Sequence, residues 1–264
     1  MQQKIEFLKS YLPRLRELLL KQTIAEVRIK EETFDNIVTD LDLFVQNHLT
    51  KALSEAFPDT AFLSEEDEQH IASPKMWVID PIDGTKNFFR RQEDYAISVA
   101  YYENSEPVFG FVYDIAKDQL FLGIKGQGAW LNGDKLPDLK EKTLNQSVLD
   151  MNLKTLYALT DKGGNIRKLN HETFAHRSIG SAALSLCRIA IGLHDIYLSS
   201  HLKFWDYAAS RIILEEVGGV VHLPFTEGYP MDDRSVTLCA CTSNRHYEAI
   251  MSTMFKEEHF KQTF

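Results

Sequence analysis

The chain has 264 residues, of which 44% are hydrophobic and 25% are charged, as in an ordinary soluble globular protein. It carries 38 acidic and 29 basic residues, a formal net charge of −9, so the basic surface that nucleic acid binding requires is not expected. No stretch reaches the roughly 18 apolar residues of a membrane span, and the charged N-terminal segment does not resemble a secretion signal. We therefore expect a cytoplasmic protein that binds neither nucleic acid nor membrane.

The first half of the chain predicts helices followed by strands. Apolar residues at helical spacing favour one or two helices over 3–31, bent or broken at Pro13, and a further helix that Thr39 caps. Period-two patterns and glycine-rich turns then predict short strands and an antiparallel meander, at 60–66, 75–80 and 95–131.

The second half alternates strands with helices. Strands are predicted at 147–151, 195–200 and 236–242, and helices at 181–192, 205–219 and 245–258. The helix from 205 is expected to stop at Gly218 and Gly219. The whole pattern predicts a layered α+β fold. We expect a single domain over 1–264, with an α+β half at about 1–145 and an α/β half at about 146–264.

Three cysteines, Cys187, Cys239 and Cys241, stand in apolar stretches. An odd number of cysteines in such surroundings is typical of reduced, buried thiols. Metal ligation by Cys239 and Cys241 is the alternative, but a spacing of one residue is poor for zinc and no partner pair of His or Cys is evident.

Five acidic residues stand at the boundaries of the predicted elements: Asp42, Glu65, Asp80, Asp83 and Asp206. Alone, Asp42 and Asp206 are explained as acids that favour the first turn of a helix, and Glu65 as part of a solvated loop. Asp80 differs because it follows four apolar residues, and burying an uncompensated charge is costly. Asp80 therefore requires a partner for its charge.

The stretch "DPIDGT", residues 80–85, combines two acids with a turn. Pro81 has no N–H with which to continue a β-ladder, and the next three residues predict a tight turn into a helix whose free N–H groups attract an anion. An EF-hand loop needs acids at alternate positions before its glycine. The haloacid dehalogenase type of phosphatase has Asp-x-Asp-Gly-Thr, with one residue fewer between the acids. The spacing excludes both.

Several carboxylates around an anion pocket repel one another and take up protons unless a cation joins them. Mg²⁺ prefers oxygen ligands and uses a few carboxylates together with phosphate oxygens of the substrate. Two such ions, roughly 3.5–4 Å apart, can clamp the attacking and leaving oxygens of a phosphoryl displacement. The residue pattern therefore favours metal-assisted phosphoryl transfer.

Motifs along most of the chain resemble those of the inositol monophosphatase family, the magnesium-dependent, lithium-sensitive phosphomonoesterases. "WVIDPIDGTKNF" is similar to the family signature, and "NIVTDLD" (36–42) and "LSEE" (63–66) to its early Thr/Asp segment and its Glu-Glu loop. "RSIGSAALSLCRIAIGLHDIY" (177–197) and "FWDYAASRIILEEVGG" (204–219) resemble its helix–strand–helix region and its Trp-Asp motif. The resemblance implies an αβαβα sandwich that forms a homodimer.

The same resemblance implies a set of metal ligands for two or three Mg²⁺ ions. Glu65, Asp80 and the carbonyl of Ile82 would hold the first ion. Asp80, Asp83 and Asp206 would hold the second, with Asp80 bridging the two.

It also implies the catalytic and phosphate-binding groups. Backbone N–H groups of Gly84 and Thr85 would bind the phosphate, while Thr85 and Asp42, with Glu65 beside them, would orient a metal-activated water for in-line attack on phosphorus. The expected activity is hydrolysis of a small phosphomonoester, an inositol 1-phosphate-like polyol or a sugar phosphate.

Contacts beyond the phosphate are expected from Asp83, Ala182, Ser199 and Asp206. Family members that act on inositol phosphates often carry Glu at the position of Ser199, where it binds ring hydroxyls. Serine supplies no charged acceptor, so inositol specificity does not follow from the resemblance. The loop between Glu65 and Asp80 is short and is expected to leave the rim open.

Two alternatives remain. Lys86 stands where a second Thr is frequent and is similar to the branch that cleaves 3′-phosphoadenosine 5′-phosphate, so a phosphatase for that nucleotide or for NADP is possible. Phe204 and Trp205 would then be candidates to stack on the purine, although both also fit a core position. The alternative of another class is a partner-binding protein in which catalysis is secondary.

Overall fold

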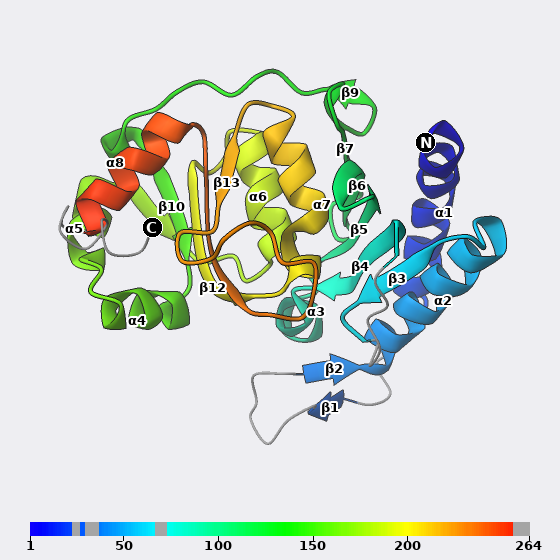
Figure 1. The fold of residues 1–264 in the computed structure, drawn as a ribbon. Coiled ribbons are helices and arrows are strands. Elements are labelled where there is room, and N and C mark those ends of the chain that lie inside the picture. Colours follow the sequence, from blue (N-terminus) through cyan, green and yellow to red (C-terminus); the bar gives the residue numbers. More distant parts are fainter. Residues whose placement is uncertain (23–26, 30–36, 67–72, 256–264) are drawn as a thin grey trace.

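The computed structural model describes residues 1–22, 27–29, 37–66 and 73–255 (Figure 1). The helices in this part are α1 (Gln2–Leu20), α2 (Asp40–Ala56), α3 (Thr85–Arg91), α4 (Leu153–Asp161), α5 (Ile166–Glu172), α6 (Ala182–Ala190), α7 (Phe204–Glu215) and α8 (Asn244–Met254). The strands are β1 (Val27–Ile29), β2 (Ile37–Thr39), β3 (Ala61–Ser64), β4 (Lys75–Asp83), β5 (Ala96–Glu103), β6 (Glu106–Asp114), β7 (Gln119–Ile124), β8 (Gly128–Leu131), β9 (Asp134–Lys135), β10 (Val148–Met151), β11 (Ala175–Arg177), β12 (Ile196–Leu202), β13 (Val220–His222) and β14 (Val236–Cys241).

The first large sheet has seven strands in the order β3-β4-β5-β6-β7-β8-β9. β3 and β4 run parallel, and every later pair is antiparallel, which confirms the predicted meander over 95–131. Both faces of this sheet are covered by helices. For that reason β4 is buried from its second residue to its last instead of alternating between core and solvent.

The second large sheet has five strands in the order β11-β10-β12-β14-β13. β10 runs parallel to both β11 and β12, whereas β14 is antiparallel to β12 and β13. The strands predicted at 147–151, 195–200 and 236–242 are therefore confirmed as β10, β12 and β14. β1 and β2 form a separate antiparallel pair.

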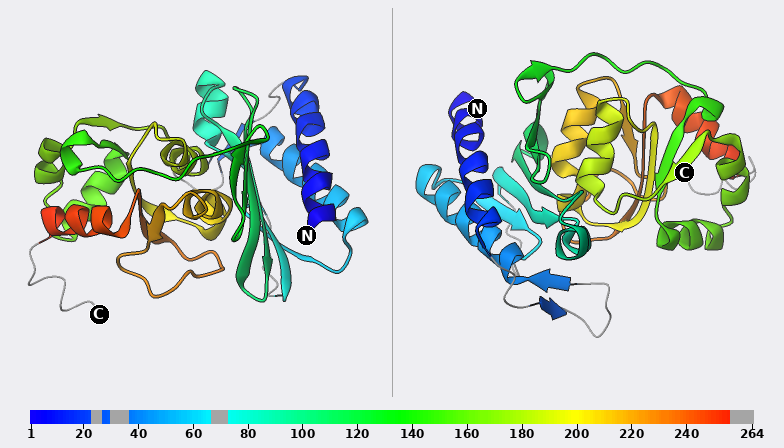
Figure 2. Two further views of the ribbon diagram at one scale, coloured as in Figure 1. Left: turned by 90° about the horizontal axis from the view of Figure 1, so that it is seen from above. Right: turned by 180° about the vertical axis from the view of Figure 1, so that it is seen from behind.

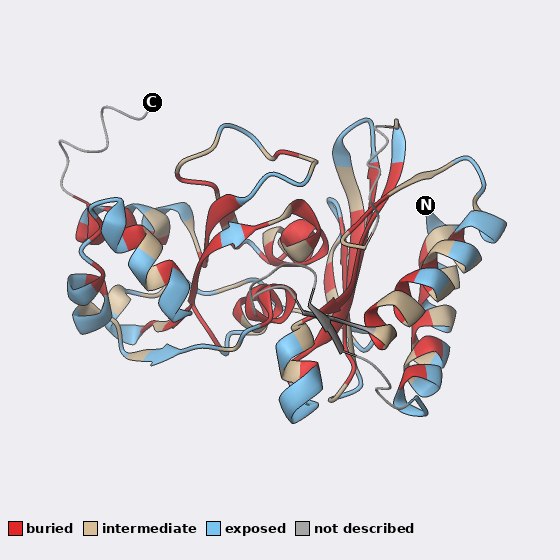
Figure 3. Ribbon diagram, turned by 90° about the horizontal axis from the view of Figure 1, so that it is seen from below, coloured by how far each residue is buried: buried red, intermediate tan, exposed pale blue. Residues whose placement is uncertain are grey.

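Helices and sheets alternate in five layers (Figure 2). α1 and α2 cover one face of the seven-stranded sheet, α6 and α7 lie between the two sheets, and α4, α5 and α8 cover the outer face of the five-stranded sheet. Buried residues concentrate along these contacts, while the outward faces of the outer helices are exposed (Figure 3). The predicted αβαβα sandwich is confirmed.

Two glycines decide how closely α7 approaches the seven-stranded sheet. Gly110 on β6 and Gly123 on β7 are paired across the sheet. A Cβ at Gly110 would lie 2.5 Å from the backbone of Ala209, and a Cβ at Gly123 2.7 Å from that of Ile213. Because neither glycine has a side chain, the α7 backbone lies directly on the strands, and the first turn of α7 is held near the end of β4.

Some element boundaries differ from the sequence-based expectation. Val27–Ile29 is a strand, not helix, because its β-branched residues at alternate positions pair with β2. α1 continues through Pro13 without a break. α7 ends at Glu215, before Gly218, and the structure adds α4 and α5 where the pattern predicts no element. The short loop after Glu65 lies largely outside the described residues.

Two further predictions concern the state of the cysteines and the presence of membrane-spanning helices. Cys187, Cys239 and Cys241 are all buried and free, as predicted. Among the described helices, none is both long enough and apolar enough to cross a bilayer.

Candidate active site

The end of β4 carries two of the predicted acids. Up to Asp80 the strand pairs in regular antiparallel register with β5. The register then shifts, and pairing resumes at Asp83 opposite Ala96, because Pro81 has no N–H to give to the ladder. The irregularity lets Asp80 and Asp83 face different partners.

Asp80 is almost completely buried, with 1% of its surface exposed. It shares a strand face with Met76 and Val78, which belong to the core that contains α6 and α7. Its Oδ1 atom has no hydrogen-bond partner in the described part of the chain. Burial raises the pKa of Asp80 well above its ordinary value, and four carboxylates raise it further: Glu65, Asp83, Asp206 and Asp42.

Asp206 lies in the first turn of α7, as its sequence position predicts. One carboxylate oxygen accepts the backbone N–H of Lys203 at 2.7 Å. Burial raises the pKa of Asp206 well above its ordinary value, the charges of Glu65 and Asp83 add to the rise, and the hydrogen bond and charge of Lys203 oppose it. Asp206 therefore belongs to the same electrostatic cluster as Asp80, although 126 positions separate them in the sequence.

Glu65 follows the last residue of β3 and stays beside β4. Its backbone N–H donates to the carbonyl of Ile79 at 3.3 Å. The side chain of Gln46, on α2, accepts from the Ser64 hydroxyl at 2.5 Å and from the backbone N–H of Glu66 at 3.1 Å. These bonds fix the turn that carries Glu65, whose charge raises the pKa of both Asp80 and Asp206.

Thr85 and Asp42 meet at the other side of the cluster. Thr85 begins α3, and its hydroxyl lies 3.1 Å from Oδ1 of Asp42, in the first turn of α2, and 3.0 Å from the carbonyl oxygen of Ile82. A hydroxyl has one proton, so Thr85 donates to one of these acceptors and retains its lone pairs for a further donor. Asp42 is 1% exposed, and its carboxylate contacts the Thr85 hydroxyl.

Asp83 joins the two halves of the chain. Its carboxylate accepts the Ser181 hydroxyl and the backbone N–H groups of Ala182, at 3.1 Å, and Ala183, at 2.8 Å, all at the start of α6. Burial raises the pKa of Asp83 to about 6, although these three hydrogen bonds oppose the rise. An acid on β4 thus binds the first turn of a helix from the opposite half of the molecule.

Gly84 makes the turn between Asp83 and α3 possible. Its φ of +90° is a left-handed conformation that a residue with a side chain rarely adopts. A Cβ at this position would also lie 2.9 Å from the Asp94 carbonyl oxygen and 3.3 Å from Cβ of Ser181. Glycine is therefore required both for the turn and for the close contact of three chain segments.

The remaining residues that the sequence predicts to contact the substrate lie in the C-terminal half of the chain. Ala182 presents its N–H to Asp83, as described above. Ser199 is buried on β12 and interacts with the phenol of Tyr197, whose pKa is raised by burial and by Asp150, Asp83 and Asp206. Ser199 is therefore linked through Tyr197 to the electrostatic surroundings of the acids. Phe204 and Trp205 are 1% and 6% exposed and pack in the core, the position that their sequence favours over a purine-stacking surface.

Three contributors were not predicted from the sequence: Ser181, Lys203 and Asn87. Ser181 caps α6, and a Ser directly before a helical pattern is a signal that could have identified it. Lys203 binds Asp206 through its backbone and donates its ammonium to the carbonyl of Asp233. Asn87 lies two residues after Thr85 and bridges two other segments.

The acids as a group fit a hard divalent cation. Asp80 has an unpartnered buried oxygen, and Asp80, Asp83 and Asp206 all have raised pKa values because their negative charges are buried together. An oxygen-binding cation removes that repulsion. In the described ranges, no group of three or more His, Cys, Asp or Glu side chains is arranged to hold a metal ion by itself. Mg²⁺ usually keeps several water ligands and also binds substrate phosphate oxygens.

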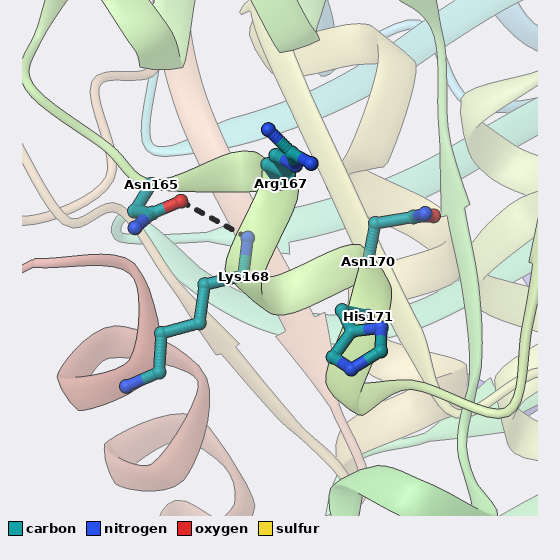
Figure 4. Close-up of a pocket in the computed structure, with 5 residues that line it drawn as sticks. All are labelled: Asn165, Arg167, Lys168, Asn170 and His171. Atoms are coloured by element: carbon teal, nitrogen blue, oxygen red, sulfur yellow. Dashed lines mark hydrogen bonds between the residues drawn. The ribbon is translucent and has the colours of Figure 1, made fainter.

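A separate hollow of about 580 Å³ lies on α5 (Figure 4). It is lined by Asn165, Arg167, Lys168, Asn170 and His171, which extend from one short helix in different directions. None of these residues is acidic, so the hollow does not offer the oxygen ligands of the β4 site.

Comparison with known proteins decides the family. The model of the inositol monophosphatase family matches residues 3–258, nearly the whole chain. The chain belongs to this family. The inositol-1-monophosphatase of Bacillus subtilis (strain 168) is 36% identical over 196 residues, which are 70% of this chain and 71% of that protein. Inositol monophosphatase 1 of Mus musculus is 34% identical over 230 residues, 83% of this chain and 81% of the mouse protein.

The structural comparison agrees. Inositol monophosphatase II of Staphylococcus aureus MSSA476 superposes with a TM-score of 0.83 at 26% identity, over 100% of this chain and 99% of that one. Membership of the family confirms the predicted enzyme class, a phosphomonoester hydrolase, and the predicted fold.

Proposed function

We propose that the protein is a Mg²⁺-dependent phosphatase that hydrolyses a small phosphomonoester by in-line attack of water. The observation that carries this proposal is the convergence of Asp80, Asp83 and Asp206 in one buried cluster, with an unpartnered oxygen on Asp80 and raised pKa values on all three. Because the members of this family are phosphomonoester hydrolases, phosphate monoesters are the first substrates to test.

The proposed metal ligands follow from this cluster. Glu65, Asp80 and the main-chain carbonyl of Ile82 would hold one Mg²⁺, and Asp80, Asp83 and Asp206 would hold a second; two or three ions are proposed in all. When bound, Mg²⁺ stabilises the charge that develops on the phosphate oxygens and lowers the pKa of water. The raised pKa values support the assignment, because carboxylates that resist ionisation when alone gain most from a cation.

The other residues position water and phosphate. Thr85 donates its proton toward Asp42 or Ile82 and accepts from the attacking water, so Thr85 and Asp42 orient that water. Glu65, whose charge acts on Asp80 and Asp206, is the third residue proposed to orient the water. Backbone N–H groups of Gly84 and Thr85, at the left-handed turn before α3, bind the phosphate.

The acceptor end of the substrate is proposed to contact Asp83, Ala182, Ser199 and Asp206. Related structures hold more than one kind of ester. SaIMPase-II has been solved with inositol monophosphate, at 26% identity and a TM-score of 0.81, and with 2′-AMP, at 25% identity and a TM-score of 0.83. A phosphatase for a nucleotide such as NADP is therefore a second candidate function. Because Phe204 and Trp205 are buried, base stacking would have to come from other residues.

Further properties are proposed from the family. A staphylococcal inositol monophosphatase-1, 25% identical, is described as an inhibitory complex with LiCl, which supports lithium sensitivity here. We also propose a homodimer in the cytoplasm and one catalytic domain. The core formed by α6 and α7 between the sheets supports a single folding unit. A role in partner binding stays a prediction.

The test is phosphate release from a panel of esters with and without Mg²⁺: inositol 1-phosphate, fructose 1,6-bisphosphate, 2′-AMP, NADP and 3′-phosphoadenosine 5′-phosphate. We expect activity that requires Mg²⁺, that is removed by EDTA and that lithium inhibits. The ranking of kcat/KM identifies the substrate class, and a flat ranking means that recognition stops at the phosphate. Absence of Mg²⁺-dependent release from every ester would overturn the proposal.

A further inference from the structure

Asn87 occupies a junction of three segments around the candidate site. It lies on α3, two residues after Thr85. Its side-chain Nδ2 donates one hydrogen to the carbonyl of Asp94 at 2.9 Å and the other to the carbonyl of Ile179 at 2.8 Å. Both donors of the amide are therefore used, and each bond reaches a different part of the chain. The bond to Ile179 crosses 92 positions in the sequence and joins the two halves of the molecule.

Ile179 begins the short segment that leads into α6. Its backbone N–H donates to Oδ1 of Asp150 at 3.2 Å, and the other oxygen of Asp150 accepts the hydroxyl of Ser185, one turn into α6, at 2.6 Å. The segment is thus held on its N–H side by β10, from the C-terminal half, and on its C=O side by Asn87, from the N-terminal half.

The spacing between Ile179 and the first donor to Asp83 is only two residues. Gly180 between them has a φ of +84°, and a Cβ there would lie 3.3 Å from Nδ2 of Asn87, so the side chain of Asn87 packs directly on this turn. Ser181, Ala182 and Ala183 then bind the carboxylate of Asp83. A shift of Ile179 by a fraction of a residue length would move all three donors together.

We propose that Asn87 is a positioning residue that clamps the segment before α6 and thereby holds Asp83 in the orientation that cation binding needs. The inference rests on the proposed function, in which Asp83 is a Mg²⁺ ligand. Asn87 itself touches neither the substrate nor the reacting atoms. Its effect passes through the Ile179 carbonyl and the three donors to Asp83.

Loss of the clamp has two opposite consequences for Asp83, and their magnitudes decide the outcome. Fewer donors free the carboxylate oxygens for a cation, but a carboxylate without its donors is less well oriented. Removing an outer partner of a metal ligand typically lowers metal affinity or activity by about 10- to 100-fold. We therefore expect weaker Mg²⁺ binding.

The first experiment measures amide hydrogen exchange in the metal-free protein, comparing wild type with Asn87→Ala. We expect peptides that span 179–184 to exchange about tenfold faster in the variant, because the N–H groups of Ala182 and Ala183 lose stable acceptors. Asn165→Ala is the matched control. Its side chain caps α5 through the N–H of Lys168 at 3.0 Å (Figure 4), and α5 lies well away from α3 (Figure 1). Asn165→Ala should therefore lower stability without changing exchange at 179–184. Unchanged exchange in Asn87→Ala would overturn the clamp.

The second experiment measures Mg²⁺ binding by calorimetry and the Mg²⁺ dependence of kcat. Asn87→Ala should bind Mg²⁺ about 10- to 100-fold more weakly and recover most of its kcat at saturating Mg²⁺. If Asn87 only supported the fold, Asn87→Ala would lower kcat without recovery at saturating Mg²⁺. Its Mg²⁺ dependence would then match that of Asn165→Ala. Equal or tighter Mg²⁺ binding in Asn87→Ala therefore contradicts the proposal.

A measurement on the unmodified protein keeps the test valid if Asn87→Ala does not fold. By nuclear magnetic resonance, the two Nδ2 protons of Asn87 should exchange with water about tenfold more slowly than those of Asn165. Equal rates would overturn the clamp. If wild type has no Mg²⁺-dependent phosphatase activity, the proposed function fails while hydrogen exchange still decides the clamp. If wild type is active and exchange is unchanged in Asn87→Ala, only the clamp fails.

Discussion

Two sites with buried acidic side chains lie near each other in this protein. They differ in how the negative charge is compensated. Asp94 is 8% exposed, and its carboxylate binds Arg188, Lys117 at 3.2 Å and Arg91 at 3.4 Å. Burial raises the pKa of Asp94, but Arg188 and Lys117 outweigh it and the net shift is downward. Its charge is balanced by the protein itself.

The acids at the end of β4 differ from Asp94 in the direction of their pKa shifts. Asp80, Asp83 and Asp206 are buried together, and the pKa of each is raised. Among the described residues, Lys203 opposes the rise on Asp206, whereas the leading causes that act on Asp80 are burial and four neighbouring carboxylates. Burial alone thus does not distinguish a structural acid from a functional one. Under the proposed function, the distinction is whether the protein supplies the compensating charge, as it does for Asp94, or leaves it to Mg²⁺.

The largest expected effect is on catalysis. Asp80→Asn removes the charge shared by both proposed Mg²⁺ sites and should lower kcat/KM by about 10³-fold, because metal-supplied charge stabilisation amounts to several kcal/mol. Phosphate release at saturating Mg²⁺ measures it. Asp134→Asn, an exposed acid on β9, is the control and should be as active as wild type. An Asp80→Asn enzyme with normal activity would show that this acid is structural, like Asp94.

The second prediction concerns stability against pH in EDTA. Asp83 has a folded pKa of about 6 against an ordinary value of 3.8, so the folded state binds more protons than the unfolded state between these values. Asp83 therefore contributes about 3 kcal/mol to the free energy of unfolding below about pH 4, and this contribution is lost as the pH rises through 6.

Denaturant unfolding of wild type and Asp83→Asn at pH 4 and pH 7 checks this sign. The difference between the two proteins should show wild type losing stability as pH rises, and Mg²⁺ should restore that stability at pH 7. Asp94, with its lowered pKa, contributes in the opposite direction. A pH-independent difference between wild type and Asp83→Asn would contradict the picture of an uncompensated cluster.

The third prediction distinguishes the role of Thr85 and Asp42, which are proposed to orient water, from that of the proposed Mg²⁺ ligands. Thr85→Val keeps the branched shape but removes the hydroxyl that lies 3.1 Å from Asp42. We expect kcat to fall by about 10²-fold, the lower end of what a positioned acid or base contributes, with Mg²⁺ affinity retained. Steady-state kinetics and calorimetry give the two values. Thr160→Val, which removes an exposed hydroxyl on α4, serves for comparison and should change neither.

The smallest effect is expected at the balanced cluster. Arg188→Met should lower the free energy of unfolding by about 2 kcal/mol, less than the loss of an isolated buried pair, because Lys117 and Arg91 remain on Asp94. Denaturant unfolding measures the loss, with Arg167→Met on the exposed surface of α5 as the reference. A loss of stability equal to that of the reference would mean that Asp94 needs no internal partner.

Local sequence signals predicted much of the site. The apolar run before Asp80 indicates a buried strand, Pro81 indicates the break in the ladder, and Gly84 indicates the turn into α3, because each depends on backbone chemistry of the residue itself. The signals were weaker where pairing decides the structure. Val27–Ile29 lies next to a helix and was expected to be helical, yet it pairs with β2.

By itself, the sequence determined the layered fold class and the family and predicted the candidate site residues, since periodicity and spaced motifs are properties of the chain alone. Only the tertiary structure decided that Asp83 is bound by the start of α6, that Phe204 and Trp205 are buried, and that Asn87 reaches Ile179. The physical reason is that each of these contacts joins segments far apart in the chain. Their energies depend on how the sheets and helices pack, not on any local pattern.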